Sequence, residues 1–376
     1  MESARHSTPP SLLGSPAYRL RLQQPVADWS QLPYDLTASI ANHLDTVEDF
    51  IAFSAVCKSW RLVYLEKNWI PMKRIPWLML GESHHNNAPM RQCFSMTRSK
   101  VYNLPKLKAS DCRYWGSCHG WVVTVSKGEM YLLNPINQNH IKLPSESALH
   151  ANGSFFDIIH RAYVFKVVQC LVVVAIYGPK YSLAFVRVGD SEWSTVQSSS
   201  PAQFCNVVCF EDRILALSMV GNIYLLDING PGLPSIQSIA SRPSEENWQQ
   251  LYLVESSGSL LMVVYYESEQ RSTPLVKFKV FRFDFSHRKW VSLEDLGDFA
   301  LVVDDHHCTS VPGDDFLQPN CIYYAKDNLD NFLACQRKYI GNYMFVYNLK
   351  DKNTDLHNVG NNSLYSCPTW FIPDLW

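Results

Sequence analysis

Residues 32–69 decide how the chain is organised; they read LPYDLTASIANHLDTVEDFIAFSAVCKSWRLVYLEKNW. Near the start of this stretch, four apolar residues recur at every fourth position, which puts side chains on one face of a helix. They are Leu32, Leu36, Ile40 and Leu44. Pro33 suits a first helical turn, where its missing N–H is not needed. The pattern predicts a helix that begins near Pro33 and ends around residues 43–45.

Two further short helices are predicted in the same stretch. Thr46 and Asp49 have the spacing of a capping box at the start of the second helix. The apolar residues of the second helix are Phe50, Ile51, Phe53 and Val56, and those of the third are Trp60, Val63 and Tyr64. So short a unit is marginal as an independent core, and it cannot hide this many large apolar side chains. The surplus predicts a surface that a partner covers.

These residues resemble an F-box. The family pattern is Leu-Pro, an acidic–apolar pair, spaced apolar residues, a helix with an acidic start, and Val-Cys-Lys-x-Trp-Arg. The matching residues here are Leu32-Pro33, Asp35-Leu36, Ile40, Leu44, Glu48-Asp49-Phe50 and Val56-Cys57-Lys58-Ser59-Trp60-Arg61. The chain departs from the pattern at Thr37 and Ala38, where bulkier residues are often found. The resemblance implies docking on a Skp-type adaptor and, through it, a cullin-based ubiquitin ligase.

The apolar pattern and the resemblance together predict an adaptor-binding surface with Arg61 at its rim. Its other residues are Leu32, Pro33, Leu36, Ile40, Leu44, Val56, Cys57 and Trp60. The simpler interpretation is an ordinary helical hairpin inside a larger domain, which would bury these side chains against the chain itself.

Composition limits what the rest of the chain can be. The chain has 376 residues, of which 13% are aromatic; this is enough for a large packed domain beside a small one. A net charge of −2 offers no general basic field for nucleic acid. The longest apolar run, 167–177 (VVQCLVVVAIY), is too short to cross a membrane as a helix and predicts a buried strand.

The N-terminal residues and the cysteines predict the cellular compartment of the protein. Its 11 cysteines have no regular spacing, and its first residues lack a secretory apolar core. This indicates reduced thiols in the cytoplasm or nucleus. Residues 1–27 are predicted to be a flexible leader, with a transit peptide as the alternative. Residues 28–70 would then form the F-box and residues 71–376 a β-rich domain.

The β-rich part contains a repeated pattern of an alternating strand, a polar turn and a shorter strand. Its six copies are 94–104, 131–144, 183–196, 223–239, 280–293 and 344–359. Asn or Asp at the end of the first strand can bond the turning backbone. The copies recur at roughly 40 to 60 residues, the period of one four-stranded blade. The fold class is therefore predicted as mainly β, with a propeller of about six or seven blades after a small three-helix domain; two β-sandwiches are the competing architecture.

A second resemblance covers most of residues 77–350. Residues 112–144 (CRYWGSCHGWVVTVSKGEMYLLNPINQNHIKLP) are similar to the opening of the uncharacterised C-terminal domain of many plant F-box proteins, a KIB-type propeller. The similarity continues in residues 204–217, 252–266 and 296–327. It implies a β-propeller that receives the substrate of a ligase, and it brings no known catalytic residue.

Three short motifs suggest other chemistry, and each has a simpler explanation. Residues 305–308 (DHHC) spell a palmitoyl-transferase signature, but that enzyme also needs membrane spans and a zinc-binding domain, so we predict a polar turn at a strand end. The possible zinc ligands are Cys112, Cys118 and His119, and Cys205 with Cys209. Cys112 and Cys118 are too far apart for the closely spaced ligand pairs of structural zinc, and Cys205 and Cys209 lie in an apolar strand, where they share a face and are expected to belong to the core. Gly116 and Gly120 could form a sugar-binding rim, but they more simply predict a tight turn before a strand at 121–125.

The sequence therefore predicts a non-catalytic substrate receptor of a Skp–cullin–F-box ubiquitin ligase. Its partners would be the Skp-type adaptor, a cullin through that adaptor, and an unidentified protein target; no cofactor, metal, nucleic acid or membrane is expected. One alternative is a lectin-like or small-ligand-binding propeller. Another is an adaptor-bound scaffold that acts without a cullin.

Overall fold

The computed structural model describes residues 28–66, 74–85, 88–108, 112–116, 120–149, 159–167, 170–196, 202–228, 234–244, 247–268, 275–325, 342–360 and 368–374. The predicted leader, residues 1–27, lies outside them. The chain divides into two compact units. The helical unit comprises Met1–His43 and Phe50–Asn68, and the propeller unit comprises Leu44–Asp49 and Trp69–Trp376.

The predicted helices are confirmed. The helical elements are η1 (Trp29–Gln31), α1 (Tyr34–Ala41), α2 (Val47–Val56) and α3 (Lys58–Glu66). The predicted cap on α2 is present: the Asp49 N–H donates to Thr46 Oγ1 at 3.3 Å. The Asp49 carboxylate in turn accepts the Thr46 hydroxyl at 2.7 Å. Two local hydrogen bonds therefore fix the beginning of α2.

The predicted apolar stripe on the first helix is wrong in part. Leu32 precedes α1 and Leu44 follows its end, so only the middle two of the four residues belong to the helix. The residues that α1 buries are Thr37, Ala38 and Ala41. Their small side chains allow a neighbouring helix to approach closely. The residues that depart from the F-box pattern, Thr37 and Ala38, thus form much of the buried face of α1.

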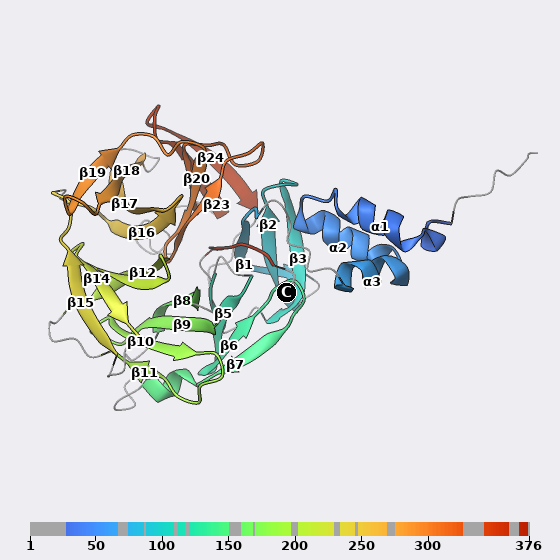
Figure 1. The fold of residues 1–376 in the computed structure, drawn as a ribbon, viewed down its shortest axis with the longest axis horizontal. Coiled ribbons are helices and arrows are strands. Elements are labelled where there is room, and N and C mark those ends of the chain that lie inside the picture. The colour runs from blue at the N-terminus through green and yellow to red at the C-terminus, as the bar shows by residue number, and fades with distance from the viewer. Residues whose placement is uncertain are drawn as a thin grey trace, which may run out of the picture. The chain divides into compact units, whose positions relative to one another are not determined.

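The propeller unit is a ring of six sheets, or blades (Figure 1). In spatial order, blade 1 contains β25 (Thr369–Phe371), β1 (Trp77–His85), β2 (Ala88–Ser95) and β3 (Lys100–Lys108); blade 2 contains β4 (Cys112–Trp115), β5 (Val122–Ser126), β6 (Glu129–Leu133) and β7 (His140–Leu143); and blade 3 contains β8 (Ile159–Val167), β9 (Cys170–Tyr177), β10 (Ser182–Arg187) and β11 (Ser194–Thr195). A short helix, η2 (Glu146–Leu149), follows β7.

The second half of the ring differs in its last blade. Blade 4 contains β12 (Phe204–Phe210), β13 (Arg213–Ser218), β14 (Ile223–Asp227) and β15 (Ser235–Ala240), and blade 5 contains β16 (Gln250–Ser256), β17 (Ser259–Ser268), β18 (Leu275–Asp284) and β19 (Lys289–Leu293). Blade 6 has five strands, in the order β21 (Cys308–Pro312), β20 (Phe299–Asp304), β22 (Cys321–Ala325), β23 (Asn342–Asn348) and β24 (Asn353–Gly360). Within it, β20 and β22 pair in parallel.

Each pair of neighbouring blades shares one hydrophobic cluster, so six clusters hold the ring together. Strand β17 shows how one strand serves two clusters. Leu261 and Val263 belong to the cluster shared with blade 6, whereas Leu260 and Met262 belong to the cluster shared with blade 4. Because side chains alternate along a strand, a strand packed between two neighbours is buried on both faces. This explains the apolar run 167–177, most of which forms β9.

The six repeated sequence segments are confirmed as the last two strands of the six blades. The predicted turn chemistry is also present. The side-chain oxygens of Asn134, Asp284 and Asn348 accept the N–H of the residue two positions on, at 2.9 to 3.0 Å. The ring has six blades, at the lower end of the predicted number, and the alternative of two sandwiches is excluded.

Two tryptophans occupy matching places in the repeats. The Trp193 Nε1–H donates to the carbonyl of Pro144 at 3.1 Å, and the Trp290 Nε1–H donates to the carbonyl of Ser241 at 2.9 Å. Each acceptor directly follows the outer strand of the preceding blade. These hydrogen bonds tie the outer edges of neighbouring blades together.

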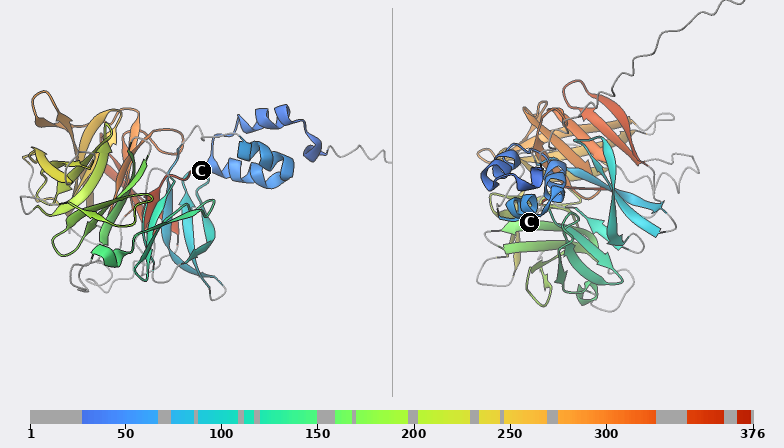
Figure 2. Two further views of the ribbon diagram at one scale, coloured as in Figure 1. Left: turned by 60° about the horizontal axis from the view of Figure 1, so that its bottom comes forward. Right: turned by 90° about the vertical axis from the view of Figure 1, so that its right-hand side faces the viewer.

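The ring closes through β25. It pairs with β1 in antiparallel register, with Trp77 opposite Phe371, and the views in Figure 2 show this red strand returning to the cyan strands of blade 1. Trp370 is only 1% exposed. Its indole N–H donates to the carbonyl of Val303 at 2.9 Å, and its backbone N–H donates to Asp304 Oδ2 at 2.8 Å. The closing strand is therefore held by blade 1 on one side and by blade 6 on the other.

Candidate functional site

The helical unit is held together by a few aromatic and polar contacts. The rings of Phe53 and Trp60 lie 4.8 Å apart between centroids. The Trp60 Nε1–H donates to the carbonyl of Trp29 at 3.0 Å, and the Ser59 hydroxyl donates to the carbonyl of Ser30 at 3.1 Å. These contacts join α3 to η1 across about thirty residues of sequence.

The Val-Cys-Lys-x-Trp-Arg segment also makes its own turn. Cys57 directly precedes α3, and its Sγ lies 3.0 Å from Ser59 Oγ. The Ser59 hydroxyl and the backbone N–H of Trp60 lower the pKa of the Cys57 thiol. The Arg61 Nε–H donates to the carbonyl of Ser54 at 3.2 Å, near the end of α2. Part of this motif therefore fixes the α2–α3 connection by itself.

Seven large apolar side chains of the helical elements remain exposed. They are Trp29, Tyr34, Leu36, Ile51, Val56, Leu62 and Leu65, with exposed fractions between 38% and 59%. Isolated apolar residues on a surface are common, but seven on η1 and three short helices are typical of a surface that binds a partner.

All nine residues predicted for the adaptor surface have accessible area. Pro33, Leu36, Val56 and Arg61 are exposed, and Leu32, Ile40, Leu44, Cys57 and Trp60 are half-buried. Leu44 belongs to the propeller unit and the other eight to the helical unit. Trp60 is also a structural residue, because it packs on Phe53 and bonds to the backbone of Trp29. The assignment of these residues to adaptor binding stays a prediction.

Several exposed apolar residues were missed by the sequence reasoning. Leu62 and Leu65 lie three positions apart on α3, on either side of the buried Val63 in sequence. Residues three apart lie on one face of a helix, but the sequence prediction assigned the apolar residues of the third helix as Trp60, Val63 and Tyr64 and overlooked this second pair. Trp29 precedes the quoted stretch and lies in a 3₁₀ turn, which has no apolar period to reveal it.

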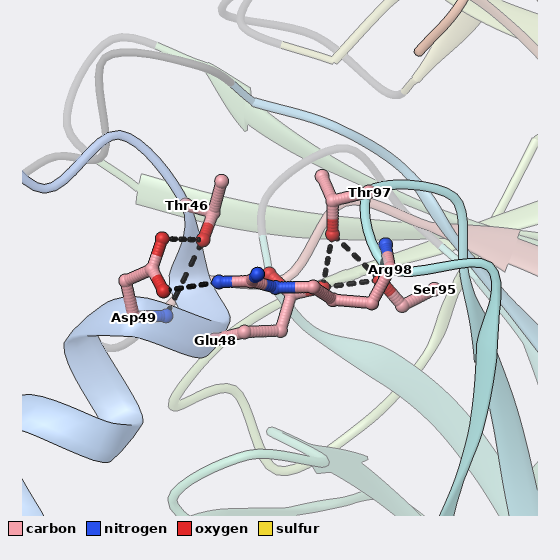
Figure 3. Close-up of polar contacts among 6 residues, drawn as sticks. All are labelled: Thr46, Glu48, Asp49, Ser95, Thr97 and Arg98. Carbon is pink, nitrogen blue, oxygen red and sulfur yellow. Dashed lines mark hydrogen bonds and ion pairs between the residues drawn. The ribbon is translucent and has the colours of Figure 1, made fainter.

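The acidic residues at the start of α2 take part in a polar network of the propeller unit (Figure 3). Glu48 Oε1 accepts the hydroxyls of Ser95 and Thr97, which lie at and after the end of β2. Asp49 Oδ1 forms an ion pair with Arg98 Nη2, and both side chains are partly exposed. These acids, which are part of the F-box pattern, thus make contacts within the chain itself.

The DHHC motif lies in the turn from β20 to β21, as predicted. Asp304 Oδ1 accepts the backbone N–H groups of His306 and His307, each at 2.8 Å. The Tyr324 hydroxyl donates to Asp305 Oδ1 at 2.9 Å. These contacts account for the turn in structural terms.

The structure explains the described cysteines and glycines singled out in the sequence without a metal or sugar site. The eight cysteines in the described part of the chain are free thiols. Among the described residues, no three His, Cys, Asp or Glu side chains are grouped so as to hold a metal ion; Cys118 and His119 lie outside them. A Cβ on Gly116 would lie 1.7 Å from the carbonyl oxygen of Trp370, and one on Gly120 would lie 2.2 Å from Asp374 Cβ. Both glycines therefore make room for the C-terminal segment.

None of the described helices has the length and hydropathy required to cross a lipid bilayer.

A helical unit with an uncovered apolar surface, followed by a six-bladed propeller, defines the class of the protein. The F-box domain family matches residues 29–63, and the KIB1-4 beta-propeller family matches residues 93–348. The chain therefore belongs to the KIB1-4 beta-propeller family and carries an F-box domain.

Proteins of Arabidopsis thaliana are similar to this chain over most of its length. It is similar to F-box protein SKIP23, with 24% identity over 79% of this chain and 82% of the relative. It is also similar to F-box protein At2g17036, with 23% identity over 78% and 81%, and to F-box protein At2g26160, with 22% identity over 80% and 96%. The matches to these relatives therefore extend over most of this chain and most of each relative.

Proposed function

We propose that this protein is the substrate-recognition subunit of a Skp–cullin–F-box ubiquitin ligase in the cytoplasm or nucleus. The observation that carries the proposal is the exposed apolar surface of the helical elements, within the segment that matches the F-box family. A Skp-type adaptor would cover this surface and, through it, a cullin would be recruited. The propeller would bind the protein that is to be ubiquitinated.

In this role the chain supplies no catalytic group. It raises the rate of ubiquitin transfer by holding the target close to a ubiquitin-loaded partner, which converts an encounter in solution into a local one. Affinity for the adaptor should be concentrated in a few large apolar side chains near the centre of the interface. Among the apolar residues predicted for this surface, Leu36 and Val56 are the two large side chains that are more than half exposed, so we test them first.

The test is the affinity of the purified full chain for a Skp-type adaptor, measured by isothermal titration calorimetry. Leu36→Asp with Val56→Asp should weaken binding at least tenfold, which is about 1.4 kcal/mol or more, because two buried carboxylates would replace apolar contacts. Val220→Asp is the matched control, because Val220 is equally exposed but lies in the propeller unit; it should bind the adaptor like the wild type.

Circular dichroism of each variant establishes that it is folded. Full adaptor affinity in the folded Leu36→Asp/Val56→Asp variant would overturn the proposed interface. Adaptor binding without recruitment of a cullin would instead support the scaffold alternative.

A further inference from the structure

A groove of about 510 Å³ lies on the propeller unit between the outer strands of blades 4 and 5. Seven consecutive residues, 238–244, line one side; they comprise the end of β15 and the residues that follow it. The other side is lined by Phe281 of β18 and by residues 288–290 at the start of β19. A groove with a long wall of this kind suits an elongated ligand better than a compact one.

The charge of the groove is positive, in contrast to the net charge of −2 of the whole chain. Arg242, Arg288 and Lys289 line it, all three are exposed, and no lining residue is acidic. Within the described residues, none of the three cations forms an ion pair. A carboxylate entering the groove would therefore meet three cations that form no ion pair with another described residue.

Two of the cations are held in place before any ligand arrives. The guanidinium of Arg242 lies over the ring of Trp248, 5.3 Å from its centroid. The Arg288 Nη2–H donates to the carbonyl of Ile239 at 2.9 Å, so the guanidinium is fixed across the groove. Trp290 is fixed in the same way by its bond to Ser241. Such preorganisation reduces the conformational entropy that binding would otherwise cost.

The walls of the groove also favour an extended chain. β15 and β19 are the outer strands of their sheets, and each pairs with a single neighbour. An extended peptide can lie along such strands, with its side chains directed alternately to the two sides. Ser238, Ser241 and Ser244 also belong to this wall, and it therefore contains polar residues as well as cations.

We propose that this groove binds an acidic, extended peptide segment of the target protein. The inference rests on the proposed role as a substrate receptor, and it adds the place and the chemical class of the recognised segment. Arginine and lysine would pair with the carboxylates, and the half-buried ring of Trp290 would contact an intervening side chain.

The test is fluorescence anisotropy of the full chain with a labelled decapeptide of alternating glutamate and serine. Arg242→Glu with Lys289→Glu should weaken binding at least tenfold. The matched control, Lys180→Glu with Arg213→Glu, makes the same change in charge at two exposed propeller residues outside the groove and should bind within twofold of the wild type. Replacing every glutamate of the peptide by glutamine should abolish binding, and raising the salt concentration should weaken it.

Equal binding by both charge-reversal variants, or equal binding of the glutamine peptide, would overturn the inference. Tighter binding of a single-stranded decanucleotide than of the acidic peptide would overturn it too, because the groove would then select nucleic acid. Adaptor affinity is measured on the same preparations. If the wild-type chain binds the adaptor but not the peptide, only the proposal for the groove is rejected. If it binds the peptide but not the adaptor, the proposed ligase role is rejected.

Discussion

Trp29 of the helical unit is 59% exposed, whereas Trp370 of the propeller unit is 1% exposed. The same contrast holds for the surrounding elements. In the described part of the chain, η1 and the three helices leave seven large apolar side chains exposed, whereas the much larger propeller leaves four exposed, at Val220, Phe285, Val291 and Leu356, and packs most of its apolar side chains into six shared clusters. A strand between two blades can bury both faces, but a short helix in a three-helix unit can bury only one. The difference teaches that the propeller buries most of its apolar side chains between its own blades, whereas the helical unit has the exposed apolar side chains expected of a partner-binding surface.

The largest difference in stability between the two regions is expected when one tryptophan in each is replaced by alanine. Trp370→Ala should lower the free energy of unfolding by about 3–5 kcal/mol, because it empties a fully buried site and weakens the closure of the ring. Trp29→Ala should change it by less than about 0.5 kcal/mol, as is usual for exposed side chains. Urea denaturation followed by circular dichroism measures both. Similar losses in the two variants would contradict the contrast.

A smaller effect is expected from one methyl group at the closure. Gly116→Ala should destabilise the propeller by about 1–3 kcal/mol, because the new Cβ would overlap the carbonyl of Trp370 and β25 would have to shift. Gly258→Ala separates this clash from backbone strain: its φ is +72° and nothing lies within 4 Å of the added Cβ. It should cost no more than about 1 kcal/mol in the same denaturation experiment. A greater loss in Gly258→Ala than in Gly116→Ala would argue against tight closure.

Lowering the pH should also reduce the free energy of unfolding of the propeller. Burial lowers the pKa of His306 to about 3 and that of His307 to about 4, whereas both titrate near 6.5 when unfolded. Between these values the unfolded state binds more protons, so the free energy of unfolding should fall as pH falls below about 6.5. Asp304 opposes this below pH 6, because burial raises its pKa to about 6 and the folded state keeps its proton. Two histidine protons outweigh one aspartate proton, so the net effect of acid is a loss of stability.

The melting temperature, measured between pH 7.5 and 5.5, should therefore fall with pH. His307→Gln should flatten this dependence, because one of the two groups responsible is then missing. An unchanged slope in that variant, with its fold intact, would show that other groups control the acid response.

The sequence predicted the outer hairpins of the blades better than their inner strands. The outer hairpins carry turn signals such as Asn134, Asp284 and Asn348, whose side chains bond the backbone two residues on, so local chemistry reveals them. The inner strands, such as β16, carry no repeated turn of this kind. The pairing of β25 with β1 was not predicted either, because its partner, Trp77, lies almost 300 residues away and no local pattern encodes it.

On the helical unit, the sequence predicted the helices and an apolar surplus, but not every residue that forms the exposed surface. Periodicity shows which side chains share a face and does not show which face the small residues will occupy. In α1, the buried positions went to Thr37, Ala38 and Ala41, and Leu36 was left outside. The basic groove was also not predicted, because β15 and β19 meet only after two separate blades have formed.

The position of β25 has a consequence for biosynthesis. A ribosome makes this strand after every other described strand, yet the strand belongs beside β1, the first one made. A nascent or prematurely terminated chain therefore has an open ring with unpaired backbone at β1, a state that chaperones and proteases recognise readily. The helical elements precede the ring in the chain, so they are synthesised before the propeller is complete. Glu48 and Asp49 at the start of α2 gain their contacts with Ser95, Thr97 and Arg98 only once β2 has been made.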